Sequence, residues 1–206
     1  VEEENLPPEV RPSKDMVKFA PRRFTINPGG SQQVRMILRM PAGMPDGEYR
    51  SHLWVRPEAS VDDLTLGESE VAQDTNKGVS VTMLAGVTMP VIVRKGNLGA
   101  TVEITNLRAS QNAGFINASF TLVRQGERSV YGDIEYICNP GGGEYQARLS
   151  RGNAIYAETN QRNFNLQIPK DPQKPACNSI KVKFAETDGF DGDSVRVLAE
   201  ASAPVQ

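Results

Sequence analysis

One stretch of the chain alternates apolar and other residues for longer than a normal β-strand. From Val79 to Val93 every odd position carries Val, Met or Ala. Most even positions carry small or polar residues, such as Ser80 and Thr82. A period of two residues is that of an extended strand with one apolar face. A typical strand has about five or six residues, so we expect part of the strand 79–93 to project beyond its own domain.

A projecting apolar strand either stays uncovered or is covered by another polypeptide. It is an aggregation hazard if it stays uncovered, because its free backbone groups and apolar face invite other chains. Alternatively, another polypeptide covers it. We expect such a partner for the strand 79–93.

Size and composition exclude several classes of protein. The chain has 206 residues, enough for one or two domains with ordinary cores. Its net charge of −2 creates no field that favours nucleic acid, and no apolar run approaches the length of a membrane span. We therefore expect neither a nucleic-acid partner nor membrane insertion. Because the chain begins with Val1 and shows no leader, we expect a processed or truncated product.

Short alternating strands separated by Gly- and Pro-rich turns predict an all-β fold of antiparallel sandwiches. Residues 97–206 supply about six or seven strands, enough for one immunoglobulin-like sandwich. Residues 16–96 supply only about four, too few to cover both inner faces of a sandwich. We therefore expect two immunoglobulin-like β-sandwich domains, 1–96 and 97–206, the first lacking its opening strands. Clear alternation occurs at Val34, Met36, Leu38 and Met40, predicted as a half-buried strand, and at Ile116, Ala118, Phe120 and Leu122.

Two cysteines, Cys138 and Cys177, stand beside predicted strand ends. We expect a disulfide between them, which would indicate an oxidising compartment. The alternative is a pair of unlinked, half-buried thiols. A metal site is not expected, because neither cysteine has a neighbour of ligand type.

Residues that could support catalysis or metal binding are sparse. His52 is the only histidine and is predicted to be an ordinary strand residue. The acidic residues Asp188, Asp191 and Asp193 lack the spacing and closing Glu of a calcium loop, so a hairpin turn is expected. The triplet Asn117-Ala-Ser119 matches a glycosylation acceptor but falls inside a strand. We expect no enzyme activity, cofactor or metal.

Four segments together resemble the periplasmic chaperones of chaperone–usher pilus assembly. They occur in that family's order, at Val17–Arg35, Pro45–Leu53, Arg124–Asp133 and Val197–Glu200. The second contains Pro-Asp-Gly-Glu-Tyr-Arg-Ser-His-Leu, and the third reads Arg-Gln-Gly-Glu-Arg-Ser-Val-Tyr-Gly-Asp. The resemblance covers roughly residues 16–206.

This resemblance implies a function for the alternating strand. In that family the last strand of the first domain is lent to an incomplete pilus subunit in the periplasm, before delivery to an outer-membrane usher. The alternating side chains fill the groove left by the strand that the subunit lacks. By register, Met89, Val91 and Val93 are expected in the protein's own core. The residues expected to contact the subunit are Val79, Val81, Met83, Ala85 and Val87.

The sequence departs from the family at the site that holds the subunit's terminal carboxylate. Family members place a basic residue on the first strand, which the given sequence lacks, and a Lys on the donor strand, where the register here places Pro90. Pro90 has no N–H for a strand ladder, as expected on an edge strand. An alternative interpretation is a structural or adhesive cell-surface protein of immunoglobulin-like modules, in which the stripe 79–93 packs within its own sandwich.

Overall fold

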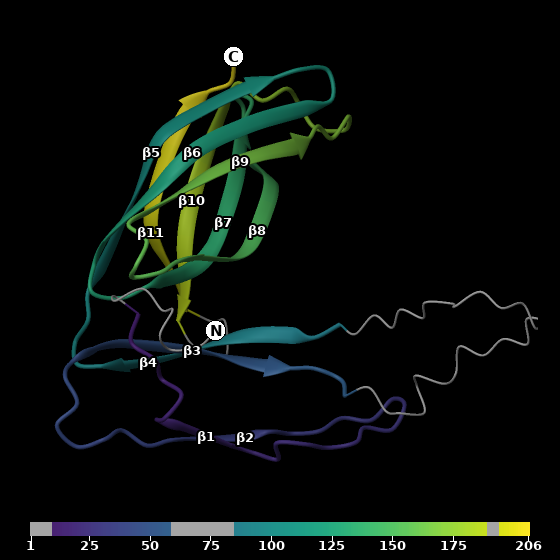
Figure 1. Ribbon diagram of the computed structural model, residues 1–206. Helices are drawn as coiled ribbons and strands as arrows, with labels where there is room; N and C mark the ends of the chain where they lie inside the picture. The colour runs from purple at the N-terminus through teal and green to yellow at the C-terminus, as the bar shows by residue number, and fades with distance from the viewer. Residues whose placement is uncertain (1–9, 59–84, 189–193) are drawn as a thin grey trace, which may run out of the picture. The chain divides into compact units, whose positions relative to one another are not determined.

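The computed structural model describes residues 10–58, 85–188 and 194–206 (Figure 1). All regular structure in these ranges is β-strand, and they contain no helix. The all-β prediction is therefore confirmed for the described residues. The strands are β1 (Val17–Ala20), β2 (Arg35–Leu38), β3 (Gly47–Val55), β4 (Val87–Lys95), β5 (Ala100–Gln111), β6 (Phe115–Gly126), β7 (Val130–Asn139), β8 (Tyr145–Ile155), β9 (Gln161–Pro169), β10 (Ser179–Asp188) and β11 (Ser194–Pro204).

The chain divides into two compact units. The first holds Arg94–Gln206 and Met40–Tyr49, with the described part of the first eleven residues. The second holds Pro12–Arg39 and Arg50–Val93, apart from the range outside the description. The assignment of immunoglobulin-like domains to 1–96 and 97–206 stays a prediction.

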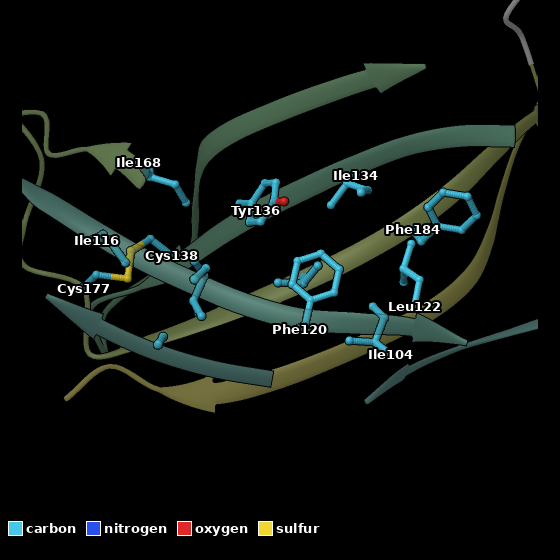
Figure 2. Close-up of a cluster of buried hydrophobic side chains, with 14 of the residues drawn as sticks. Ile104, Ile116, Phe120, Leu122, Ile134, Tyr136, Cys138, Ile168, Cys177 and Phe184 are labelled. Atoms are coloured by element: carbon cyan, nitrogen blue, oxygen red, sulfur yellow. A yellow bond between two sulfur atoms is a disulfide. The ribbon is translucent and has the colours of Figure 1, made fainter. Parts of the chain in front are cut away.

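Two antiparallel sheets in the first unit enclose one apolar core. One sheet has the strand order β11-β10-β7-β8 and the other β5-β6-β9. Their alternate side chains meet between the sheets, as expected of a β-sandwich (Figure 2). The alternation predicted for residues 116–122 is confirmed, because each even position in that range is buried. The largest fully buried side chains of this core include Tyr136, Phe184, Leu122, Ile134 and Ile155.

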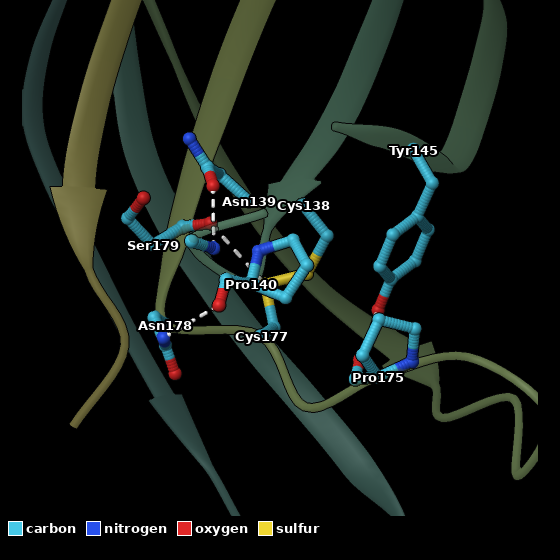
Figure 3. The surroundings of a disulfide bond; sticks show 9 residues. Cys138, Asn139, Pro140, Tyr145, Pro175, Cys177, Asn178 and Ser179 are labelled. Atoms are coloured by element: carbon cyan, nitrogen blue, oxygen red, sulfur yellow. Dashed lines mark hydrogen bonds between the residues drawn. A yellow bond between two sulfur atoms is a disulfide. The ribbon is translucent and has the colours of Figure 1, made fainter. Parts of the chain in front are cut away.

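Cys138 and Cys177 form a disulfide at one end of this sandwich (Figure 3). Their Cα atoms are 5.4 Å apart, and both residues are buried. The bridge joins β7 to the segment that leads into β10. Beside it the Asn178 amide N–H donates to the Asn139 carbonyl at 3.1 Å. The link therefore fixes the start of β10 against the end of β7.

Arg124 organises the turn between β6 and β7. Its side chain is almost fully buried, and its guanidinium donates to the carbonyl oxygens of Gly126, Arg128 and Ala157 at 2.8–3.0 Å. Three carbonyl oxygens thus accept hydrogen bonds from a single planar donor. This is a structural role for the first residue of the segment Arg124–Asp133.

Gly132 and Arg128 bring this segment against β10. A Cβ on Gly132 would lie 2.1 Å from the Ala185 carbonyl oxygen, so only glycine permits the approach of the two strands. The Arg128 guanidinium forms a bidentate contact with the Glu186 carboxylate and donates hydrogen bonds of 2.6 and 2.8 Å. Both side chains of the pair are largely buried. This bidentate contact therefore fixes the geometry between the two segments more strictly than a surface ion pair does.

The second unit has much less strand pairing. β1 pairs only with β2, in the register Val17↔Leu38 to Ala20↔Arg35, and β3 pairs with β4. All four residues of β2 are exposed, so the prediction of a half-buried strand around Met36 and Leu38 is wrong. The described part of the unit has too few strands to cover that face.

We expect the disulfide to stabilise the sandwich considerably. Replacing both Cys138 and Cys177 by Ser frees a loop of 39 residues, and the chain-entropy model assigns about 4 kcal/mol of unfolding free energy to its closure. Urea denaturation followed by circular dichroism measures the loss. A reducing agent should lower the midpoint of the wild type and leave the double variant unchanged; equal midpoints for wild type and variant would contradict the prediction.

Tyr136 makes the stability of the sandwich fall in strong alkali. Burial raises the pKa of Tyr136 from 10.0 to about 12, despite the opposing effect of Arg148. Between those values the unfolded tyrosine loses its proton and the folded one keeps it, so the free energy of unfolding decreases as pH rises. Tyr136→Phe should flatten this decline between pH 10 and 12 in urea titrations. An unchanged slope in that variant would show that another group is responsible.

Candidate functional site

Strand β4 offers a free edge in the described structure. It pairs with β3 in a two-stranded sheet, and no other described strand lies on its opposite edge. A free strand edge presents backbone N–H and C=O groups that an incoming strand can pair with. β4 can therefore accept a further strand.

The exposure of the alternating side chains decreases along β4. Val87 is 62% exposed and Met89 45%, whereas Val91 is half-buried and Val93 only 5% exposed. The expectation that Met89 lies in the protein's own core is therefore wrong. The core begins at Val91. At Val87 and Met89, no other described residues bury the apolar side of the strand. The apolar stripe thus ends on an open surface.

The start of β4 differs from the predicted extent of the strand. Ala85 and Gly86 precede β4 and are exposed, and the strand begins at Val87. Val79, Val81 and Met83 lie outside the described residues. Of the five residues predicted to bind a subunit, the structure therefore places two, Ala85 and Val87, both in the open.

Pro90 interrupts the hydrogen-bonding capacity of β4. It lies inside the strand, is exposed and has no N–H to donate. A strand added along the free edge therefore lacks one ladder bond wherever the Pro90 nitrogen faces it. An edge position tolerates this loss better than a central one.

A buried serine fastens β3 and β4 within the second unit. The Ser13 hydroxyl donates to the Val91 carbonyl at 3.1 Å, and the Ser13 N–H donates to the Ser51 hydroxyl at 3.0 Å. Ser13 has no exposed surface. The segment before β1 thus holds both strands where the stripe becomes buried, so the strand is supported at one end of its exposed part.

Glu48 at the start of β3 is the centre of a polar cluster in the first unit. Its side chain is only 5% exposed, and its carboxylate accepts from the Ser129 N–H at 2.9 Å, the Ser129 hydroxyl and Arg94 Nε at 3.0 Å. Arg94, at the end of β4, also donates to the Ser129 carbonyl at 2.9 Å. Four donated bonds satisfy the groups of this cluster, so a carboxylate can be buried here at tolerable cost.

The end of β4 is held by a tight turn. Gly96 has φ 86°, and a Cβ at this position would lie 2.4 Å from Asp46 Oδ2. Lys95 reaches the same carboxylate at 3.4 Å and donates to the Met44 carbonyl. A side chain at 96 would displace Asp46 and strain the backbone. The position therefore requires glycine.

A small hollow lies between the two sheets of the second unit. Its volume is about 80 Å³. Each of the strands β1 to β4 contributes an apolar side chain to its wall. The lining residues are Ser13, Lys14, Val17, Phe19, Met36, Ser51, His52, Leu53 and Val91. The described residues of this unit thus leave part of its apolar interior unfilled.

Exposed apolar side chains dominate the described part of the second unit. Its fully buried large hydrophobic residues are Met16 and Val93. Contiguous exposed apolar surface in a folded protein indicates an interaction site or a missing cover. The exposed large hydrophobic residues of this unit are Phe24, Ile26, Met36, Ile37, Leu38, Trp54, Val55, Val87 and Met89.

Groups suited to chemistry are not gathered in the described residues. His52 is exposed on β3, and no three His, Cys, Asp or Glu side chains in those ranges lie close enough to hold a metal ion. Within the same ranges, no helix is long and apolar enough to cross a membrane. Asp188 pairs with Ser194 across the β10–β11 hairpin, and Asp191 and Asp193 lie outside the description.

Sequence reasoning missed the cluster of Glu48, Arg94 and Ser129. Glu48 follows the Pro-Asp-Gly turn, and Ser129 lies in the segment Arg124–Asp133, so both segments stood out as motifs. Their pairing joins residues far apart in the chain, which periodicity does not reveal. No local signal marks Glu48, because it lies on the face of β3 opposite the buried Tyr49 and reads as an ordinary polar strand residue.

Comparison with known proteins gives no match. No family model, no curated protein and no solved structure matches this chain.

We expect Glu48→Ala to destabilise the protein by about 2–3 kcal/mol, because it leaves the Ser129 donors and Arg94 without their acceptor. Thermal and urea unfolding measure the change. The matched control is Glu58→Ala, whose partner Arg23 and own carboxylate are both exposed; such a pair contributes about 0–1 kcal/mol. Equal effects of the two substitutions would show that the Glu48 cluster does not stabilise the fold.

Proposed function

We propose that this protein is a non-enzymatic, ATP-independent periplasmic chaperone that holds incomplete pilus or fimbrial subunits before they reach an outer-membrane usher. One observation carries the proposal: β4 has a free edge beside an exposed apolar stripe that begins at Val87 and Met89. The resemblance of four sequence segments to the chaperone–usher family points in the same direction. Both units would then be immunoglobulin-like domains.

Strand addition is the binding mode that this geometry favours. A subunit with an unfilled groove aligns beside β4 and pairs with its free backbone groups. Val87 and Met89 enter the groove, each contributing about 1.5–3 kcal/mol of burial before ordering costs. The alternation continues along the sequence through Val79, Val81, Met83 and Ala85, which we propose as further contacts.

The pattern of anchoring also suits a strand that is lent to a partner. Ser13 and the Glu48 cluster hold β4 and its neighbour at the end toward Val93, while the end toward Val87 remains open. Since one end is fixed, less conformational entropy is lost when the other end binds. The Cys138–Cys177 disulfide is compatible with the oxidising periplasm.

A charged side chain on the apolar stripe should abolish capture. Met89→Asp and Val87→Asp each place a carboxylate in an apolar groove, and we expect at least a tenfold loss of affinity, about 1.4 kcal/mol or more. The measurement is co-purification with a co-expressed pilus subunit that lacks its completing strand. Both residues are exposed, so the fold should be unaffected.

The matched control is Thr88→Asp, which adds the same charge to the same strand on the opposite face. It should retain most of the capture. Undiminished co-purification of the Val87 and Met89 variants would contradict the proposal and favour a structural or adhesive surface protein, whose stripe serves only its own fold. Unfolding midpoints of all three variants exclude a general loss of structure.

A further inference from the structure

The outer face of the three-stranded sheet carries polar side chains in two rows. On β6, the even positions from Ile116 to Leu122 point into the core, so the odd positions point outward. The residues of β5 and β9 that pair directly with these odd positions lie on the same outer face of the sheet. The first row is Ser110, Asn117 and Gln167, and the second is Arg108, Ser119 and Asn165.

These two rows line one open hollow of about 470 Å³, to which Gln206 also contributes. That volume lies within the range of small-molecule sites, about 300–1,000 Å³. The lining contains five uncharged hydrogen-bonding side chains from the two rows and a single cation, Arg108. All of its lining residues belong to the first unit, and none of them belongs to β4.

An aromatic ring lies on the same outer face of β6, one outward position before Asn117. Phe115 is 40% exposed and stands two residues before Asn117, so both side chains leave the same face of β6. Its cross-strand partner is Pro169. An exposed aromatic ring beside polar groups gives a ligand an apolar platform and hydrogen-bonding partners together.

The choice of residues on this face opposes strand stability. Asn is depleted in β-strands, and Thr or Val would fit the same outward positions better. Nevertheless Asn117 lies within β6, and Asn163 and Asn165 lie within β9. Asn163 accepts a hydrogen bond within the sheet from the Thr121 hydroxyl, so the amides that β-propensity leaves unexplained are those lining the hollow, Asn117 and Asn165.

The other sheet of the same sandwich shows what an ordinary solvated face looks like. There Lys183 is paired in register with Glu135 on one side and Glu200 on the other. Lys181 contacts Glu144 at 2.6 Å. On that face, positive and negative side chains alternate. In the two rows, by contrast, Arg108 is the single charged side chain among amides and hydroxyls. The two faces therefore differ in chemistry although they share one core.

We propose that this hollow binds an uncharged oligosaccharide. A carboxamide both donates and accepts hydrogen bonds, which matches the donor and acceptor capacity of neighbouring sugar hydroxyls. Adjacent strands repeat these groups at about 4.8 Å, comparable with the width of a pyranose ring. Phe115 supplies the surface against which the C–H face of a ring packs.

Two other ligand classes fit less well. A nucleic acid or other polyanion needs several cations, and the hollow has one in a chain of net charge −2. A peptide strand binds through a free strand edge, whereas these groups project from the face of the sheet. The sugar site is independent of the chaperone proposal, because it uses no residue of β4.

The test is a ¹⁵N–¹H NMR titration of the full chain with chitotetraose, cellotetraose and mannotriose. We expect at least one sugar to shift the backbone amides of the two rows saturably, with a Kd of about 1 mM, because hydrogen bonds at an open surface compete with water. Asn117→Thr and Asn165→Thr should each weaken binding at least tenfold. Threonine suits a strand, so these variants should fold.

The matched control is Asn163→Thr on the same strand β9. The Asn163 side chain already accepts a hydrogen bond from the Thr121 hydroxyl at 2.8 Å and does not line the hollow, so binding should persist. The proposal is overturned if none of the three sugars shifts the rows at about ten times the expected Kd. Shifts that survive both hollow variants, or that map to the charged sheet around Lys183, would overturn it as well.

Discussion

A strand that is paired on one side only leaves every second set of its backbone groups without a protein partner, and β4 is such a strand in the described structure. Its exposed end also carries Val87 and Met89, so two unmet requirements coincide: hydrogen bonding along the edge and burial of the stripe. A strand that is added along this edge supplies the hydrogen bonds and also covers the apolar stripe. The proposed capture of an incomplete subunit rests on this coincidence, because neither an exposed valine nor a free edge alone would identify a binding strand.

The two units show how the same alternating sequence behaves with and without a second layer. In the first unit, the even residues from 116 to 122 are buried in one core with Tyr136 and Phe184 of the facing sheet. In the second unit, Met36 and Leu38 have the same spacing but stay exposed. The difference is the number of strands available to face them, since a side chain is buried only where another layer covers it.

Much of the architecture was predictable because strand alternation is local. The all-β class and the core face of residues 116–122 followed from a period of two residues and from Gly and Pro turns. The Cys138–Cys177 disulfide was predicted in preference to free thiols and is confirmed, although cysteine spacing alone does not determine proximity. Met89 was assigned to the core wrongly, because the register of a stripe shows which face a residue occupies but not how far the covering layer extends.

The sequence by itself determined which residues share a face, because in an extended chain successive side chains point to opposite sides. Only the tertiary structure decided which faces are covered and which distant residues meet. The Glu48 carboxylate reaches Ser129 across the chain, and amides of β5, β6 and β9 align into the rows beside Phe115. These contacts depend on strand order and register, which arise from pairing between segments far apart in the sequence. No local pattern encodes them, since each partner taken alone is an ordinary polar strand residue.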